Sequence, residues 1–220
     1  MAAFSPTPSA LTLLIFFAVA PERQTDVFQL NVNATEQTIR HFPGFLGGVF
    51  HQSLDGARMA EYIQWRSPDD FAAARQRPDF SEHLPHVFAL AELDFARYEV
   101  VSGISRRQGE QEERASPTIA ADRTIATIIA RYTVEPQEQL PLTHQLQQQL
   151  DQRLHSAPGW LSTSLLREVD GTRVVAYLQV QKAGDDAAAT LAQSLATVGA
   201  PYAACDVHQY TVDWVTPHEP

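Results

Sequence analysis

The spacing of hydrophobic residues along the first half of the chain predicts an alternation of strands and helices. Continuous or alternating apolar runs are typical of strands, and apolar residues three to four positions apart are typical of an amphipathic helix. The pattern predicts elements in the order β-α-β-β-α-β, over residues 11–20, 22–41, 45–53, 58–66, 67 onward and 98–104. This is the order of the ferredoxin-like (split βαβ) motif, so we expect an α+β fold.

Turn residues set the boundaries between these elements. Asp55-Gly56 favours a tight hairpin between the second and third strands, because both turn positions adopt positive φ. Ser67 can cap the second helix, and Pro68 suits its first position. Pro78 and Pro85 are expected to interrupt that helix.

The second half of the chain repeats the first at an offset of 115 residues. Pro43-Gly44-Phe45-Leu46 falls on Pro158-Gly159-Trp160-Leu161, and eight of 23 positions are identical between 43–65 and 158–180. The same elements are therefore predicted at 123–134, 137–156, 160–169, 172–181, 185–197 and 206–215. We expect three segments: a first unit over 1–105, a polar linker over 106–122 and a second unit over 123–220.

Charge and composition exclude several classes of protein. With 16 Lys and Arg against 26 Asp and Glu, the net charge is −10, which argues against a nucleic-acid binder. Cys205 is the one cysteine and Lys182 the one lysine, which argues against disulfides, cysteine-based metal sites and catalytic lysines. With one cysteine, we expect a protein of the reducing cytoplasm. The apolar run at 10–20 is too short to span a membrane and follows no basic residue, so it is interpreted as a strand.

Several of these motifs together resemble the antibiotic biosynthesis monooxygenase family. They are Pro-Gly-Phe at 43–45, the Asp-Gly hairpin and Tyr-Ile-Gln-Trp-Arg-Ser at 62–67, ahead of a helix that opens on acidic residues. The resemblance covers 11–104 well and 123–215 as a degenerate second copy. It implies a dimeric α+β barrel, which this chain would build from its two tandem repeats. Anthrone oxygenases, haem-degrading enzymes and cyclases share that fold, so the resemblance is more specific for fold than for reaction.

One face of the strand over 58–66 differs between the repeats. By the period of two, Glu61 and Trp65 share the face toward the helices, where the resemblance places the pocket. The second repeat has Ala176 and Val180 at these positions. A copy that has lost its polar and aromatic groups is expected to be a scaffold, so we place the working site in the first repeat.

The opposite face of the same strand is kept in both repeats. Tyr62 and Gln64 recur at the same offset, which favours packing in the sheet interior, and both are also candidates for substrate contact. His51, on the neighbouring strand, is replaced by Leu166 in the second repeat and is a candidate for catalysis.

The resemblance implies roles for particular residues. In the anthrone-oxygenase branch, a strand Trp is accompanied by an Asn four positions earlier, a Tyr six positions later and an Arg on the following helical segment. Trp65 matches the Trp, whereas Glu61 stands in place of the Asn and Phe71 in place of the Tyr. His83 and His86 occur where the Arg would be. We therefore expect a pocket of this type with altered hydrogen-bonding groups.

Oxygen reacts with an electron-rich enolate or phenolate, so the site needs a base and an environment that excludes water. If buried beside Trp65, Glu61 would have a raised pKa and act as a base near neutral pH. His51, His83 or His86 would share that role or hydrogen-bond the oxyanion. Flat walls for a polycyclic ligand are expected from Phe45, Phe50 and Phe71. No third ligand accompanies the two later histidines, so no metal site is predicted.

These inferences lead to an oxygenase that tailors an aromatic polyketide in antibiotic biosynthesis. The altered pocket resembles oxygenases that open the B ring of an angucyclinone by C–C cleavage, with O2 and reduced flavin (FADH2 or FMNH2) from a partner flavin reductase. The alternatives are a cofactor-independent anthrone-type monooxygenase that makes a quinone, a non-oxidative polyketide cyclase and a ligand-binding module. We expect no tightly bound cofactor, and either a monomer or a homodimer is compatible with one internal barrel.

Overall fold

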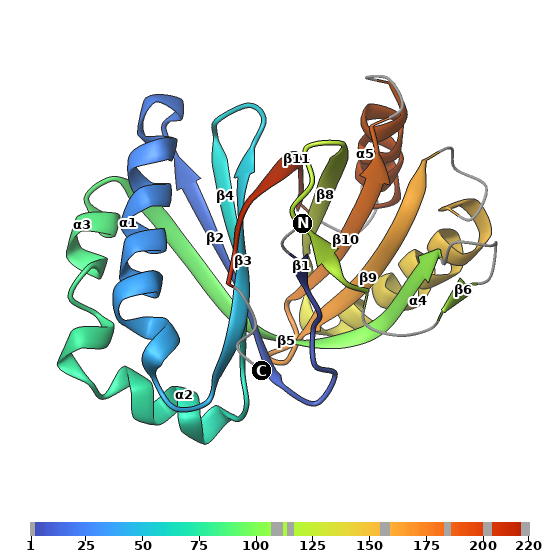
Figure 1. The fold of residues 1–220 in the computed structure, drawn as a ribbon. Helices are drawn as coiled ribbons and strands as arrows, with labels where there is room; N and C mark the ends of the chain where they lie inside the picture. The colour runs from blue at the N-terminus through green and yellow to red at the C-terminus, as the bar shows by residue number, and fades with distance from the viewer. Residues whose placement is uncertain are drawn as a thin grey trace.

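The computed structural model describes residues 3–106, 112–113, 117–154, 159–182, 186–199 and 204–216. Eight of the strands in this described part close an antiparallel barrel in the order β2-β4-β3-β11-β8-β10-β9-β5, and β5 pairs back onto β2 (Figure 1). Helices α1, α2 and α3 lie outside the sheet of the first half, and α4 and α5 lie outside that of the second (Figure 1).

Both halves follow the predicted element order. The first contains β1 (Ala3–Phe4), β2 (Leu11–Val19), α1 (Gln24–Gln37), β3 (Phe45–Ser53), β4 (Arg58–Trp65), α2 (Pro68–Arg75), α3 (Leu84–Phe88) and β5 (Ala91–Arg106). The second contains β6 (Glu112–Glu113), β7 (Ile119–Ala120), β8 (Ile125–Thr133), α4 (Gln139–Gln149), β9 (Trp160–Glu168), β10 (Arg173–Gln181), α5 (Asp186–Gly199) and β11 (Ala204–Val215). The α+β fold with two tandem ferredoxin-like units is therefore confirmed.

One strand begins well ahead of its predicted start. The strand β5 begins at Ala91 and not at 98, because Leu93 and Phe95 alternate toward the helices ahead of the predicted start. Within the predicted linker 106–122, residues 107–111 and 114–116 lie outside the described residues. The rest includes β6, which pairs with β5, and β7, which pairs with β1.

The last strand of each half joins the two sheets. Along β5, residues 91–98 pair with β2 and residues 98–105 pair with β9, so Tyr98 faces both Thr12 and Glu168. Along β11, residues 204–210 pair with β8 and residues 210–215 pair with β3. Each half thus extends its last strand onto the sheet of the other, which closes the barrel within one chain.

A β-bulge near the start of β3 reverses its inside–outside alternation. Phe45 pairs with Trp65 and Gly47 with Gln64, so Leu46 lies outside the ladder. Gly47 has a φ of 145°, and an added Cβ there would lie 2.7 Å from the Phe4 ring. Because the extra residue shifts the phase, Phe50 faces the helices together with Phe45.

The repeated Tyr-x-Gln pair lies in the barrel interior. Tyr62 and Tyr177 meet there with ring centroids 6.4 Å apart. The amide of Gln64 accepts from the backbone N–H of Thr7 at 2.7 Å and donates to its carbonyl at 3.1 Å. Gln179 binds the backbone of Ala120 in the same way. The two glutamines therefore fix the segments that cover one end of the barrel, next to the β1–β7 pair.

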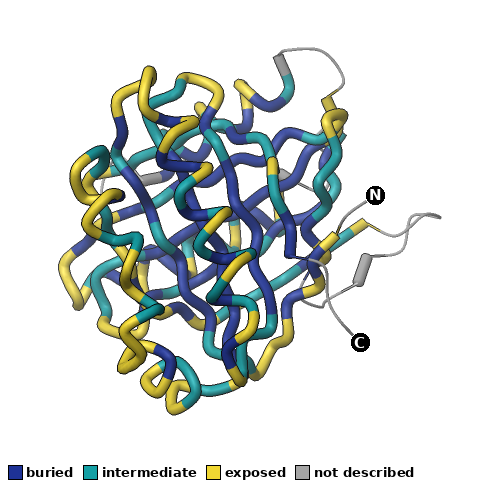
Figure 2. Tube along the Cα trace, turned by 60° about the vertical axis from the view of Figure 1, so that its left-hand side comes forward, coloured by how far each residue is buried: buried dark blue, intermediate teal, exposed yellow. Residues whose placement is uncertain are grey.

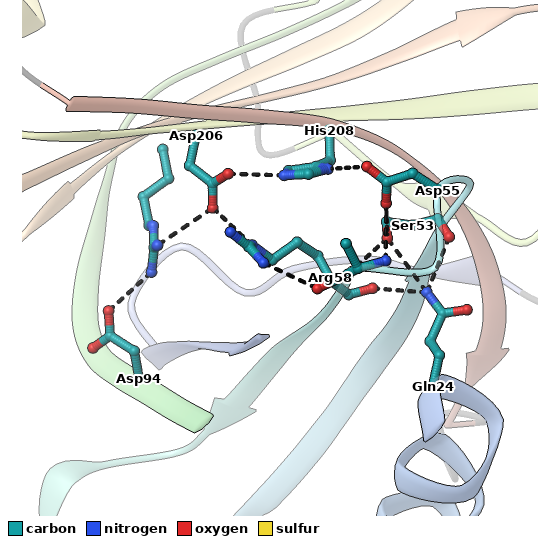
Figure 3. Close-up of polar contacts among 9 residues, drawn as sticks. Gln24, Ser53, Asp55, Arg58, Asp94, Asp206 and His208 are labelled. Carbon is teal, nitrogen blue, oxygen red and sulfur yellow. Dashed lines mark hydrogen bonds and ion pairs between the residues drawn. The ribbon is translucent and has the colours of Figure 1, made fainter. Parts of the chain in front are cut away.

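Charged residues from both halves form a network at the β3–β4 hairpin (Figure 3). His208 lies between Asp55 at 2.7 Å and Asp206 at 2.8 Å, and Arg58 pairs with Asp206 at 3.1 Å. Hydrogen bonding to Asp206 raises the pKa of His208 above its ordinary value. Gln24 donates to the carbonyl oxygens of Ser53 and Arg58, which anchors α1 to the hairpin. The network therefore connects the first half to the second.

The buried residues form three layers. One cluster fills the barrel, and one lies between each half-sheet and its own helices. Figure 2 shows the strands largely buried and the outer surfaces of the helices exposed. Among the described residues, no helix is both long enough and apolar enough to cross a membrane.

Candidate active site

A cavity of about 250 Å³ lies in the first half, between the sheet and the helices. Its floor comes from β2, β4 and β5, and includes the apolar side chains of Leu13, Ile15, Ile63 and Leu93. Its aromatic walls are Trp65, Phe71, Phe80, Phe88 and Phe95. Its polar groups are Asn31, Thr35, Glu61, Arg75 and His83. A mostly apolar cavity with a few polar groups is typical of a small-molecule site.

Strand pairing places Glu61 in the middle of an apolar row. Directly opposite residues on antiparallel strands point to the same face. Glu61 pairs with Phe50 on β3 and with Ile15 on β2, and Ile15 pairs in turn with Phe95 on β5. The carboxyl therefore projects into the cavity with apolar side chains on both sides.

The environment of Glu61 favours its neutral form. The side chain is 3% exposed, and its Oε1 atom is buried without a hydrogen-bond partner among the described residues. Burial raises the pKa of Glu61 from 4.5 to about 8. Such a carboxyl can exchange a proton near neutral pH, as the sequence predicts for a general base.

Trp65, four residues further along the same face of β4, anchors an aromatic group in the wall of the same cavity. Its ring centroid lies 5.6 Å from that of Phe71 and 6.4 Å from that of Phe80, and Phe45 meets it edge-on at 5.4 Å. Phe45 itself does not line the cavity, but it packs behind Trp65. The aromatic rings provide the flat apolar surface that a fused-ring ligand would contact.

Three polar residues of the cavity, Asn31, Thr35 and Arg75, were not predicted from the sequence. Asn31 and Thr35 are buried on α1, one turn apart and in line with Val27. The amide nitrogen of Asn31 donates to the Val27 carbonyl at 2.9 Å. A polar pair at i and i+4 on the buried stripe of a helix was the signal that could have found them.

His83 and His86 have different positions. His83 is half-buried in the cavity wall, and burial lowers its pKa below the ordinary value of 6.5. His86 is exposed on α3 and does not line the cavity. His83 is the N-cap residue of α3 and His86 lies inside the helix, and of the two only His83 lines the cavity.

The structure separates four other predicted residues from the cavity. Tyr62 and Gln64 lie in the barrel interior, as their repetition favoured. His51 also faces the interior, because the bulge at Leu46 reverses the alternation of β3. Phe50 faces the helices next to Glu61 but does not line the cavity, and it packs against Trp214 with ring centroids 4.6 Å apart. Their expected contacts with a ligand in this cavity are therefore not supported.

His51 has a structural environment that predicts acid sensitivity. Its two ring nitrogens contact the Ala60 carbonyl and the Tyr177 hydroxyl, each at 2.9 Å, and burial lowers its pKa to about 4. The unfolded chain therefore takes up the proton first as the pH falls. The free energy of unfolding should decrease by about 3 kcal/mol between pH 6.5 and pH 4.

The variant His51→Leu should lack this component, since Leu166 occupies the matching position of the second repeat. Denaturant unfolding of both proteins across this pH range measures the difference between their free energies of unfolding. The carboxylates are the same in both proteins, so their contributions cancel in this difference. Parallel curves would show that His51 titrates normally in the folded protein.

The corresponding face of the second half is filled by apolar side chains. Ala176 and Val180 occupy the positions of Glu61 and Trp65 and are fully buried. They pack in one cluster with Leu142 and Leu146 of α4 and with residues of α5.

Among the described residues, no three His, Cys, Asp or Glu side chains are grouped so that they could hold a metal ion.

Comparisons with known proteins agree with this architecture. The sequence model of the antibiotic biosynthesis monooxygenase family matches residues 10–85. Tetracenomycin-F1 monooxygenase of Streptomyces glaucescens is 43% identical over 86 residues, which are 39% of this chain and 77% of that protein. The crystal structure of an anthrone oxidase-like protein is similar over 100% of this chain and 98% of that chain, with a TM-score of 0.77 and 18% identity. The chain therefore belongs to the antibiotic biosynthesis monooxygenase family, a family of oxidoreductases.

Proposed function

We propose that the chain is an oxygenase that oxidises an aromatic polyketide in the cavity of its first half. The observation that carries the proposal is that the buried, unpartnered carboxyl of Glu61 lines the same cavity as the aromatic wall around Trp65. The 43% identity to tetracenomycin-F1 monooxygenase supports the substrate class. On this proposal the unit 1–105 performs the reaction, and the unit 123–220 completes the barrel as a scaffold.

Glu61 is proposed as the general base. Its carboxylate removes a proton from an anthrone CH2 group or a phenol that lies against Trp65, which leaves an electron-rich carbanion or phenolate. Oxygen adds to the carbon, and the proton held by Glu61 returns to form a hydroperoxide. Loss of water then gives the carbonyl, so that CH2 and O2 become C=O and H2O. All electrons come from the substrate, and no outside reductant is needed.

His83 and Asn31 are proposed to hold the substrate oxygen. Since burial lowers its pKa, His83 is neutral at neutral pH and has one N–H to donate. A neutral donor stabilises a developing oxyanion without taking part in the proton transfer. The apolar side chains around Glu61 exclude water, which protects the carbanion from reprotonation by solvent.

Angucyclinone B-ring opening would require reduced flavin as a co-substrate and a flavin reductase as the partner. Oxidation of an activated CH2 group or a phenol requires neither, because the substrate itself supplies all the electrons. A base and an aromatic wall, the groups that line this cavity, are those that the second reaction needs. We therefore propose quinone formation over ring opening.

Oxygen uptake with a panel of anthrones and polycyclic phenols tests the proposal. We expect one O2 consumed per quinone formed, with no reductase or NADH present. Uptake only with a flavin reductase and NADH would favour the ring-opening reaction. Turnover without oxygen would identify a cyclase, and binding without any product would identify a ligand-binding module. Either of the last two results would overturn the oxygenase proposal.

A further inference from the structure

Arg75 occupies an unusual position at the mouth of the cavity. It lies in the last turn of α2, exposed to solvent, and its guanidinium carbon is 5.7 Å from the centre of the Phe71 ring and 5.9 Å from that of Phe95. Both distances fall within the range of cation–π contacts. The guanidinium is thus held between two aromatic side chains that belong to the cavity wall.

The charge of Arg75 is not neutralised by the protein. Its neighbours Arg66 and Arg77 are paired with Asp70 and Asp79. Among the described residues, no carboxylate lies within ion-pair distance of Arg75. The chain as a whole has a net charge of −10. An unpaired guanidinium beside an apolar cavity therefore makes a local positive site that attracts an anion.

A surface groove continues from this point. Phe71, Arg75 and Phe95 line both the cavity and the groove, which extends to Arg97 and to Asp170 of the second half. Arg97 is engaged with Asp170 at 3.5 Å, and Asp69 is also in the groove without an ion pair to Arg75. The free donors of Arg75 are therefore available where a ligand would leave the cavity.

We propose that Arg75 forms an anion-binding subsite, and that the preferred substrate is a fused-ring polyketide with a carboxylate on the edge that faces the mouth. The inference rests on the proposed function, because it specifies the substrate of that cavity. The planar guanidinium of Arg75, in cation–π contact with Phe71 and Phe95, presents its N–H groups in one plane, which suits bidentate binding of a carboxylate. Glu61 lies on the cavity floor, so Glu61 and Arg75 would contact different parts of the ligand.

Isothermal titration calorimetry with two non-oxidisable probes tests the subsite. The probes are an anthraquinone carboxylate and its carboxamide, which have nearly the same shape and differ in charge. The wild-type protein should bind the carboxylate at least tenfold more tightly. Arg75→Gln should weaken carboxylate binding by about ten- to a hundredfold, the effect of one charge-assisted hydrogen bond, and carboxamide binding by less than about threefold.

Two further variants are the controls. Arg77→Gln removes the same charge from a guanidinium that also stacks on an aromatic ring, Phe42 at 4.7 Å, but does not line the cavity, so it should keep the preference. Arg75→Lys should keep part of it. The proposal would be overturned if Arg75→Gln weakened the binding of both probes equally, or if it still preferred the carboxylate to the carboxamide. Carboxylate binding without oxygen uptake by any anthrone would leave the subsite intact and contradict the oxygenase function.

Discussion

Glu61→Gln should lower kcat/KM for oxygen-dependent turnover by about a hundred- to ten-thousandfold, the usual contribution of a positioned general base. Glutamine has nearly the same size and keeps the polar atoms of the side chain, so the cavity should keep its shape and its affinity for an unreactive ligand. The measurement is oxygen uptake with an anthrone, together with the dissociation constant of an anthraquinone.

The same reaction should depend on pH through Glu61. Because the active form is the carboxylate and burial raises the pKa to about 8, kcat/KM should increase with pH and level off above that value. A phenolic substrate also ionises, so two substrates with different pKa values are compared. A midpoint that follows the substrate, or an unchanged rate in Glu61→Gln, would contradict the role of Glu61 as the base. Glu22→Gln, an exposed substitution of the same kind, is the matched control.

The sequence was sufficient to predict the half of the chain that carries the cavity and the strand that carries its carboxyl. Simple alternation along β4 placed Glu61 and Trp65 on the helix-facing side, and the structure shows both in the cavity wall. Comparison of the two repeats added information. Ala176 and Val180, at the positions of Glu61 and Trp65, indicated that the second repeat has apolar side chains in place of a cavity. These inferences depend on the period of two, which holds wherever a strand is regular.

The residues that were misplaced depend on irregular backbone. His51 would share the face of Phe45 in a regular strand, but the single extra residue at Leu46 reverses the order. Nothing in the neighbouring sequence specifies a bulge beyond Gly47-Gly48. Arg75 was not predicted at all, since its contacts depend on how α2 packs over the sheet, where Arg75 meets Phe95 of β5. Packing between distant elements is not specified by the local sequence.

The second large effect concerns stability: the difference in free energy of unfolding between Glu61→Gln and the wild type should grow as the pH rises. The pKa of Glu61 is about 8 in the folded protein against an ordinary value of 4.5. The folded state therefore retains a proton that the unfolded chain releases above pH 4.5. The wild type loses stability progressively between these two values, by about 5 kcal/mol once Glu61 is fully ionised, and the glutamine variant does not.

Denaturant unfolding of both proteins from pH 5 to pH 9 measures this difference, and only its change with pH matters, because burial of the amide adds a constant offset. Glu22→Gln should give a difference that stays flat. If the difference for Glu61→Gln is also flat, the carboxyl is solvated in the folded protein, and the raised pKa that the base requires does not exist. The stability difference and the rate profile report the same proton. The stability difference should therefore stop growing, and the rate should reach half its maximum, near pH 8. If the two pH dependences agree, the ionisation of Glu61 that costs the protein stability is the same ionisation that makes the cavity active.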